Sequence, residues 1–189
     1  MPLTQYLAAS SVDGFIADEH DDLSWLLSMP GGDDEANPYQ AFIEQVGAIS
    51  MGATTYSWIL EHDEGPWPYT QPCWVFSHHE LPPKDGADVR FTSAPVAQVH
   101  AEMSAAAGDR NLWLVGGGDL VGQFLDADLL DELIVSVTPV LLGRGAPLLP
   151  RRRTEPMRLL SATPSPAGTF VHLHYTLRGD PPDPVHQGG

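Results

Sequence analysis

The 189-residue chain has one cysteine, few basic residues and no long apolar run, and each of these shortages excludes a class of protein. Because Cys73 is the only cysteine, no intrachain disulfide can form. Nine basic residues against 25 acidic ones give a formal net charge of −16. This charge argues against a surface for nucleic acid or anionic membranes, since both need clustered Lys and Arg. Without a stretch of about 18 apolar residues, no membrane-spanning helix is expected.

Internal repeats are also absent, and the amino terminus lacks the basic segment that begins a secretory signal. We therefore expect a cytoplasmic protein. A hydrophobic content of 42% over this length is enough for one domain with a sizeable core. We place that domain at residues 1–178 and interpret residues 179–189, GDPPDPVHQGG, as a flexible tail.

The most informative segment that is present is NLWLVGGGDLVGQFL, residues 111–125. An apolar strand pattern leads into three glycines, and a helix with one apolar face follows. Such a junction lets the backbone approach a phosphate and aims helix N–H groups at it, which predicts a nucleotide cofactor. The spacing is not that of the dinucleotide motif G-x-G-x-x-G, because Gly122 comes one residue late. A tight strand-to-helix turn without a ligand is the alternative interpretation.

Strand and helix patterns alternate along most of the chain. This order predicts an α/β fold: a three-layer sandwich around a mostly parallel central sheet, with antiparallel strands at the C-terminal end. The expected strands are residues 3–9, 15–17, 48–51, 73–76, 89–91, 112–115, 133–137 and 170–177. The expected helices lie around Trp25, from Asn37–Pro38, over 54–60, from a cap at Ser93 to Gly108, and after the three glycines.

Four segments occur in an order that resembles the dihydrofolate reductase-like superfamily. They are YLAASSVDGFIA (6–17), ISMGATTYSWI (49–59), WVFSHH (74–79), and LVGGGDLVGQFL followed by DELIVSVTPVLLGRGAPLL (114–149). Within the superfamily the chain is most similar to the branch that shares the C-terminal reductase domain of bacterial riboflavin biosynthesis. The resemblance covers nearly the whole chain except the acidic loop after residue 17 and the tail.

The resemblance implies a reduced nicotinamide cofactor across the carboxyl edge of the sheet, where open α/β sheets generally bind ligands. NADPH is the family expectation, and NADH is not excluded. By motif, Ala8, Ala9 and Ile16 would border the nicotinamide, and Gly52, Thr54 and Thr55 would open a helix beneath the phosphates. Ser77 and His78 would lie toward the adenosine end, and Gly116, Gly117, Gly118 and Leu120 would cradle the pyrophosphate.

Three positions depart from this family pattern. Relatives commonly carry an arginine, which helps to hold the 2′-phosphate of NADPH, where this chain has Ala53. An arginine or another polar residue is usual at His78, and some members carry an arginine at Asp119. Because none of these side chains is a fixed cation, the sequence weakens the expectation of NADPH over NADH.

Two carboxylates are candidates for a proton donor, since a carboxyl group in an apolar pocket can keep its proton near neutral pH. Asp13 lies in a Ser–Val–Asp–Gly turn beside the expected nicotinamide site. The alternative, which we favour, is that its side chain caps that turn. Glu35 precedes the helix that starts at Asn37–Pro38, and plain solvation in an acidic loop is favoured over catalysis there too.

Aromatic side chains offer a wall for a flat substrate. Trp25, Tyr39 and Phe42 are the candidates, although Tyr39 and Phe42 share a helix face with core residues and favour the core. The pairs His78–His79 and His172/His174 lack a third ligand at recognisable spacing, so no metal is expected. The run 151–153 of three arginines is interpreted as a solvated turn, with contact to an anionic substrate as the alternative.

The preferred hypothesis is a nicotinamide-dependent reductase that transfers a hydride to a small flat heterocycle, pterin-like or pyrimidine-like, or to its ribose derivative. The alternative is a nucleotide-binding or sensory module on the same fold without turnover. A homodimer is expected, because the apolar segment 133–149 ends in a turn-rich edge that commonly lies at a subunit interface in this branch. The same apolar run could instead be internal.

Overall fold

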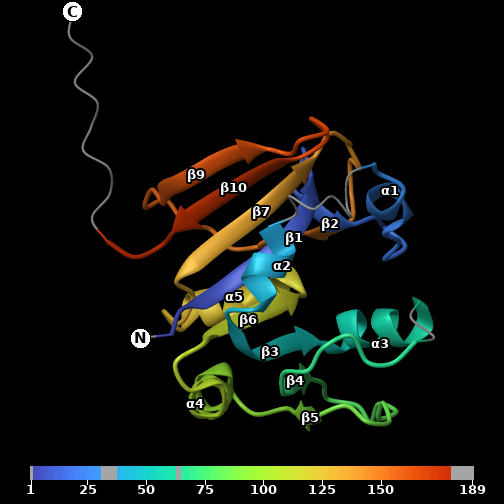
Figure 1. Ribbon diagram of the computed structural model, residues 1–189, viewed down its shortest axis with the longest axis vertical. Coiled ribbons are helices and arrows are strands. Elements are labelled where there is room, and N and C mark those ends of the chain that lie inside the picture. Colours follow the sequence, from blue (N-terminus) through green and yellow to red (C-terminus); the bar gives the residue numbers. More distant parts are fainter. Residues whose placement is uncertain (1, 31–37, 63–64, 180–189) are drawn as a thin grey trace, which may run out of the picture.

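A computed structural model describes residues 2–30, 38–62 and 65–179 of the chain (Figure 1). In this part the central sheet has eight strands in the order β5-β4-β3-β6-β1-β7-β10-β9. In that order they are β5 (Val89–Thr92), β4 (Cys73–Phe76), β3 (Val46–Gly52), β6 (Asn111–Gly116), β1 (Thr4–Ser11), β7 (Glu132–Thr138), β10 (Val171–Thr176) and β9 (Arg158–Pro164).

The strands from β5 to β7 run parallel, and β10 is antiparallel to both β7 and β9. The expected mostly parallel sheet with antiparallel C-terminal strands is therefore confirmed. A second, two-stranded sheet pairs β2 (Phe15–Ala17) with β8 (Ala146–Pro147). Because the parallel strands all point the same way, their carboxyl ends form one edge of the molecule.

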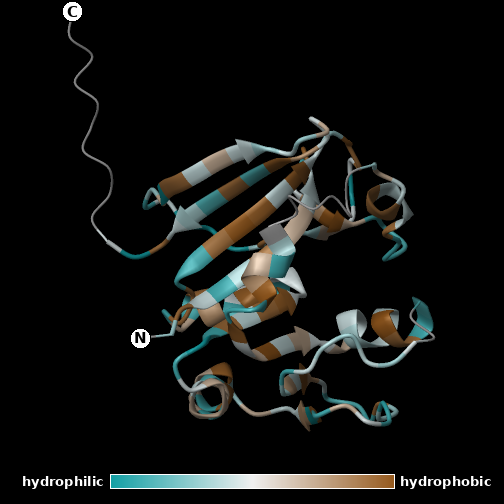
Figure 2. Cartoon of the chain, in the orientation of Figure 1, coloured by the Kyte–Doolittle hydropathy of each residue, from teal (hydrophilic) through white to brown (hydrophobic). Residues whose placement is uncertain are grey.

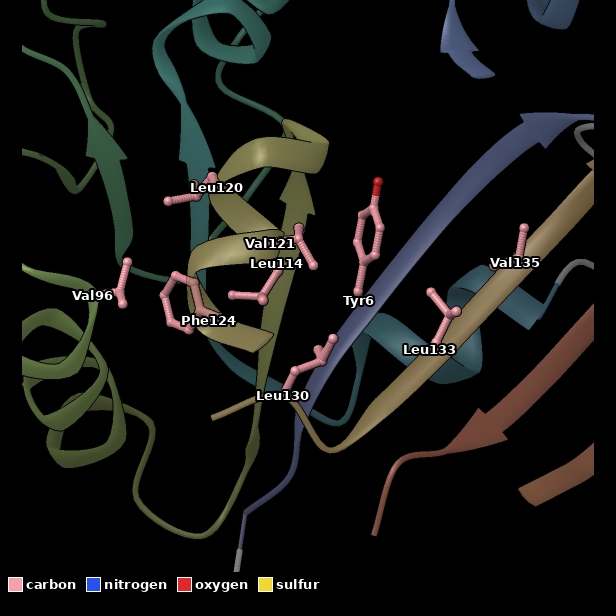
Figure 3. Packing of buried hydrophobic residues seen from close by; sticks show 9 residues of the cluster. All are labelled: Tyr6, Val96, Leu114, Leu120, Val121, Phe124, Leu130, Leu133 and Val135. Carbon is pink, nitrogen blue, oxygen red and sulfur yellow. The ribbon is translucent and has the colours of Figure 1, made fainter. Parts of the chain in front are cut away.

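Helices cover both faces of the sheet and complete three layers. On one face, α4 (Val96–Ala107) and α5 (Gly118–Asp126) pack against alternate residues of β6, Leu112 and Leu114 (Figure 3). On the other face, α2 (Pro38–Ile43) and α3 (Ala53–His62) pack around Trp113, the residue between them. The period-2 alternation of a strand buried on both sides therefore places its side chains in two separate cores.

β7 is hydrophobic along most of its length (Figure 2) and lies between β1 and β10. The nearly continuous apolar pattern of 133–137 therefore belongs to an internal strand of the sheet, while Leu141, in the turn-rich part of the segment 133–149, is 73% exposed. The homodimer stays a prediction. Within the described residues, no helix is long and apolar enough to cross a membrane.

Two details of the expected element boundaries were wrong. Ser93 does not cap α4: the helix begins at Val96 after Pro95, whose ψ of 143° is extended and which makes no side-chain cap bond. The sequence analysis also did not predict β9, in which every residue is exposed. An exposed edge strand has no buried face, so it lacks the alternation by which strands are found. The remaining helix, α1 (Ser24–Leu27), contains Trp25 as expected, while Asn37 lies outside the described residues.

Candidate cofactor site

The candidate site lies at the carboxyl edge of the sheet, at the ends of the neighbouring strands β3 and β6. The helix after β3, α3, leads to β4 on one side, whereas the helix after β6, α5, leads across β1 to β7 on the other. The chain therefore leaves these two strands in opposite directions and on opposite faces. Open α/β sheets bind ligands at such a switch point, outside the carboxyl ends of the strands.

The two helix starts are in close proximity. Met51 pairs with Gly116 across the two strands, and a Cβ atom on Gly116 would lie 3.2 Å from Thr55 Oγ1. A Cβ atom on Gly52 would have no atom within 4 Å, so open space lies over the start of α3. The structure thus brings together the glycines and threonines that the family motifs had placed around the cofactor phosphates.

Gly117 gives α5 its starting geometry. Its φ of 86° is in the region that favours glycine, and it caps the helix without a side-chain hydrogen bond. The first helical hydrogen bond runs from Val121 N to Gly117 O at 3.1 Å. The amides before Val121 therefore lie outside the helical ladder, where they are available to a bound anion. This arrangement fits a pyrophosphate held by backbone rather than by side chains.

Two neighbouring residues have packing roles that the motif did not reveal. A Cβ atom on Gly118 would overlap the backbone oxygens of Pro147 and Leu148, so the segment around β8 packs directly on the helix start. The Leu120 side chain is 7% exposed and lies in the core with Val121 and Phe124 (Figure 3). Only the backbone of Leu120 is therefore available to a cofactor.

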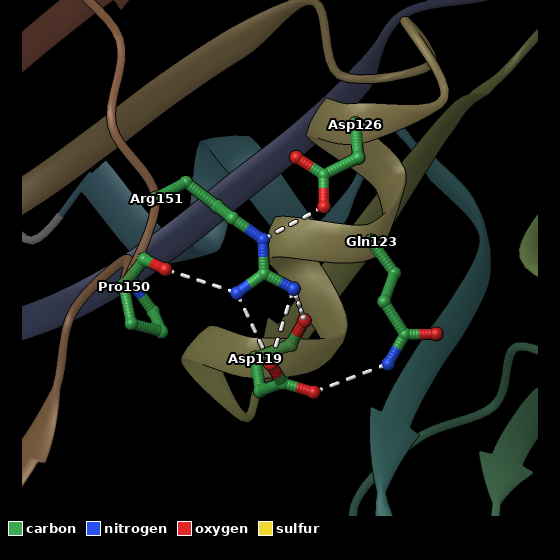
Figure 4. A network of polar contacts seen from close by, with 5 residues as sticks. All are labelled: Asp119, Gln123, Asp126, Pro150 and Arg151. Atoms are coloured by element: carbon green, nitrogen blue, oxygen red, sulfur yellow. Dashed lines mark hydrogen bonds and ion pairs between the residues drawn. The ribbon is translucent and has the colours of Figure 1, made fainter.

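Arg151 fastens the segment after β8 to α5 (Figure 4). Its Nε donates to Asp126 Oδ2 at 2.7 Å, and both Nη atoms lie 3.1 Å from Asp119 Oδ1. A Cβ atom on Gly122 would lie 2.6 Å from the Arg151 Cζ atom, so this glycine makes room for the guanidinium. Hydrogen bonds to Asp126 and Asp119 raise the pKa of Arg151. The run 151–153 was expected to be a solvated turn. Arg151 instead forms an ion-paired clamp on α5, while Arg152 and Arg153 are exposed.

The Asp13 carboxylate joins the turn between β1 and β2 to the loop after β7. Its Oδ1 accepts hydrogen bonds from Ser11 Oγ at 2.6 Å and Leu142 N at 3.1 Å, and its Oδ2 accepts one from Gly143 N at 2.7 Å. Hydrogen bonding, first of all from Ser11, lowers the pKa of Asp13. This geometry favours the capping interpretation over proton donation. Glu35, the other candidate, lies outside the described residues.

The residues expected around the nicotinamide lie at the same edge. Ala9 is half-buried near the end of β1 and pairs with Ser136 of β7. Ile16 is half-buried in β2, which pairs with β8 beside the start of α5. Ala8 faces the other side of β1 and packs against the core beneath α5.

The residues expected toward the adenosine end follow the end of β4. Ser77 Oγ donates to His79 O at 2.8 Å and accepts from His79 N at 3.0 Å, which forms a local turn. His78, at the tip of this turn, is exposed. Arg90 is not at this edge: it pairs with Asp88 and lies 4.5 Å above the Trp74 ring, on the α4 side of the sheet.

The aromatic residues expected to contact substrate have different positions. Tyr39 and Phe42 pack edge-on against Trp113, at 5.8 Å and 5.5 Å between ring centroids, so both belong to the core. Phe42 also lines a cavity on that face of the sheet. Trp25 is half-buried on α1, and its Nε1 donates to Asp22 O at 3.1 Å.

The histidine pairs do not form a metal site in the part of the chain that the structure describes, where no group of three or more His, Cys, Asp or Glu side chains is placed to hold an ion. His172 and His174 share a strand face, and their partners are Ser136 and Glu132 of β7. Because these partners lie on another strand, no local sequence pattern marks them.

The strand order and the paired helix starts define a dihydrofolate reductase-like reductase fold. The structure is similar to a putative riboflavin biosynthesis protein from Shewanella sp. PV-4, with a TM-score of 0.80 and 27% identity over 92% of this chain and 98% of that one. It is also similar in fold to dihydrofolate reductase from Enterococcus faecalis complexed with NADP(H), with a TM-score of 0.61 and 16% identity over 92% and 94% of the two chains.

The chain belongs to the RibD C-terminal domain family, whose profile matches residues 67–170. Among curated proteins, the uncharacterized protein YwjB of Bacillus subtilis (strain 168) is 33% identical over 168 residues, which cover 88% of this chain and 93% of YwjB. The resemblance drawn from the four sequence segments is therefore confirmed at the level of family and fold.

Proposed function

We propose that the protein is a nicotinamide-dependent reductase that transfers a hydride from NADPH to a small flat heterocycle, pterin-like or pyrimidine-like, or to its ribose derivative. The observation that carries the proposal is the meeting of the α3 and α5 amino termini at the carboxyl ends of β3 and β6. Two positive helix ends this close together suit a pyrophosphate. The likeness to a reductase complexed with NADP(H) supports the same class of cofactor.

The bound nicotinamide would supply the hydride, and the protein would supply binding and orientation. The first-turn amides of α3 and α5 would hold the pyrophosphate, and the small side chain of Ala9 would leave room beside β1. Asp13 joins the turn before β2 to the loop that precedes β8. The β2–β8 pair, held in this way, would border the nicotinamide and limit the access of water. Asp13 would stay ionised, because its pKa is lowered, and so would not donate the proton.

The choice between NADPH and NADH depends on what contacts the 2′-phosphate. Ala53 and the exposed His78 stand where arginines occur in relatives, and Asp119 is paired with Arg151. We keep NADPH as the expected cofactor and expect a smaller preference over NADH than a fixed cation would give, since a charge-assisted hydrogen bond contributes about 1.5–3 kcal/mol.

The test is titration of the protein with NADPH and with NADH, followed by tryptophan fluorescence and thermal shift. Gly117→Val is expected to weaken binding about tenfold or more, which corresponds to about 1.4 kcal/mol, because a side chain there would obstruct the pyrophosphate. Gly86→Val is the matched control: φ is 75° at Gly86 and 86° at Gly117, and a Cβ atom on Gly86 meets nothing within 4 Å.

Both variants should lose similar stability from backbone strain, about 1–3 kcal/mol, but only Gly117→Val should lose affinity. No response of the parent to either cofactor at millimolar concentration would reject the reductase. Parent-like affinity in folded Gly117→Val would reject this position for the pyrophosphate.

The second candidate function is a nucleotide-binding module without turnover. It is favoured by the state of Asp13, whose carboxylate is occupied by three hydrogen bonds and is therefore unsuited to donate a proton. Cofactor binding without oxidation across a panel of pterins, flavin precursors and small carbonyls would support it, and one confirmed turnover would exclude it.

A further inference from the structure

A cavity of about 350 Å³ lies on the α2 side of the sheet, over β7, β10 and β9. Its floor is apolar and comes from Leu7 of β1 and Ile134 of β7, with Phe42 of α2 at one side. Thr163, His172 and His174 give its outer part a polar lining. A volume of this size, apolar with a few convergent polar groups, is typical of small-molecule sites.

Strand register explains why these polar side chains converge. His172 pairs with Ser136 on β7 and with Thr163 on β9, while His174 pairs with Ile134 and Ser161. Directly paired residues point to the same face of a sheet. The two histidines and the β9 hydroxyls therefore project together from the face that carries Ile134.

His172 is held in place but keeps one ring nitrogen for a ligand. Its Nδ1 is 2.8 Å from Ser136 Oγ, and its ring stacks on Phe170 with centroids 6.3 Å apart. Within the described residues, no hydrogen bond reaches its Nε2. Burial lowers the pKa of His172, so the ring is neutral near pH 7 and presents either a donor or an acceptor, depending on the tautomer.

His174 is fixed by a second polar chain on the same face. Its Nε2 lies 3.0 Å from Glu132 Oε2, which also accepts from Gln5 Nε2 at 2.7 Å. The Gln5 side chain is buried, and its Oε1 atom has no partner. The Glu132 carboxylate is therefore paired with His174 and Gln5. Among the described residues that line the cavity, none is a Lys or an Arg.

The cavity is near the carboxyl edge of the sheet. Ser136, the partner of His172, pairs with Ala9 of β1. Since neighbouring strands are about 4.8 Å apart, β10 lies about 10 Å from β1. A two-ring molecule in the cavity could therefore extend from His172 toward the edge that carries Ala9.

We propose that this cavity binds the heterocyclic part of the substrate, an uncharged flat ring system, and that His172 and Thr163 hydrogen-bond its ring nitrogens and carbonyls. The apolar floor would contact the ring face, and the hydroxyl and imidazole groups of the described lining suit an uncharged ring better than a phosphate. The inference rests on the proposed reductase function, because it names the substrate pocket of that reaction.

The experiment measures binding of two probes, pterin and 6-aminouracil, by calorimetry and saturation-transfer NMR. Thr163→Trp places a large side chain in the cavity from an exposed strand, and its matched control is Ala162→Trp, which pairs with Leu173 instead. We expect Thr163→Trp to weaken probe binding about tenfold or more and Ala162→Trp to leave it within about twofold. His172→Phe keeps an aromatic ring at this position but loses the hydrogen bond, and should cost about fivefold.

NADPH and NADH titrations of the same variants separate the two proposals. Unchanged cofactor binding with lost probe binding supports the pocket. A parent that binds cofactor but neither probe, or a Thr163→Trp variant that binds them normally, overturns the pocket and leaves the reductase standing. If the parent binds the probes but neither cofactor, and the variants weaken probe binding, the pocket is supported and the reductase is overturned. Light scattering of the variants separates the cavity from a subunit contact at β9: lost probe binding in a Thr163→Trp variant that keeps the parent's oligomeric state supports the pocket, and loss that occurs only when the oligomeric state changes overturns it.

Discussion

At the residue scale, the three glycines between the end of β6 and the start of α5 have different physical reasons to be glycine. A side chain at Gly116 would contact Thr55, one at Gly118 would overlap the backbone of Pro147 and Leu148, and Gly117 needs its positive φ. A glycine-rich segment in a sequence is consistent with all three reasons. Only the surroundings of each Cβ position distinguish them.

This difference predicts opposite outcomes for two alanine substitutions at the same edge of the sheet. Gly118→Ala should lower the free energy of unfolding by about 1–3 kcal/mol, because backbone atoms cannot yield as a flexible side chain does. Gly52→Ala should change it by less than about 1 kcal/mol, since its Cβ would meet nothing within 4 Å. Urea unfolding measures both. Equal losses would show that β8 does not pack on the start of α5 as described.

At the scale of elements, α5 is held at its two ends by different means. Its amino terminus lies under the backbone of β8, and Arg151 joins Asp119 in its first turn to Asp126 in its last. The position of α5, whose first-turn amides lie at the candidate site, is therefore fixed relative to the β2–β8 pair. Positioning of the site depends on this segment as much as on the sheet.

We expect Arg151→Met, which keeps an unbranched apolar stem, to lower the Tm by about 2–4 °C at low salt. The difference from the parent should shrink in 1 M NaCl, because salt screens exposed ion pairs. Arg152→Met removes the neighbouring exposed arginine and serves as the control, with little expected change. A Tm for Arg151→Met equal to that of the parent at low salt would contradict the clamp.

At the scale of the whole molecule, the central sheet ends in β9, an edge strand whose residues are all exposed. This edge strand is exposed along its length, and Leu159 and Leu160 keep 50% and 42% of their surface. An exposed edge strand with apolar side chains is a site for association. We therefore place the predicted homodimer interface at β9 and not at the internal strand β7.

We expect light scattering to give about twice the 20.5 kDa mass of one chain at micromolar concentration. Leu159→Glu should produce a monomer, because a charge would be buried at the interface. Leu27→Glu, at a residue that is 66% exposed on α1, is the control and should remain dimeric. A monomeric parent would reject the homodimer.

The sequence by itself determined the order of most strands and helices and the glycine turn that joins β6 to α5. Both are written in local patterns: the apolar run and the glycines of 111–125 specify a strand, a turn and a helix within 15 residues. Family motifs then placed Gly52, Thr55 and Gly116 near one ligand, and the structure has them at one edge.

Tertiary structure alone decided which side chains serve that edge. Two of the three partners of Asp13 are backbone amides 129 and 130 residues away, and the Ser136 hydroxyl that holds His172 is 36 residues away. Nothing local marks these pairs, because they form only when distant strands and loops are brought together. The cavity also depends on β9, whose exposed residues carry no periodic signal. Contacts between distant segments are set by packing of the whole sheet, and for that reason they could not be predicted from the sequence.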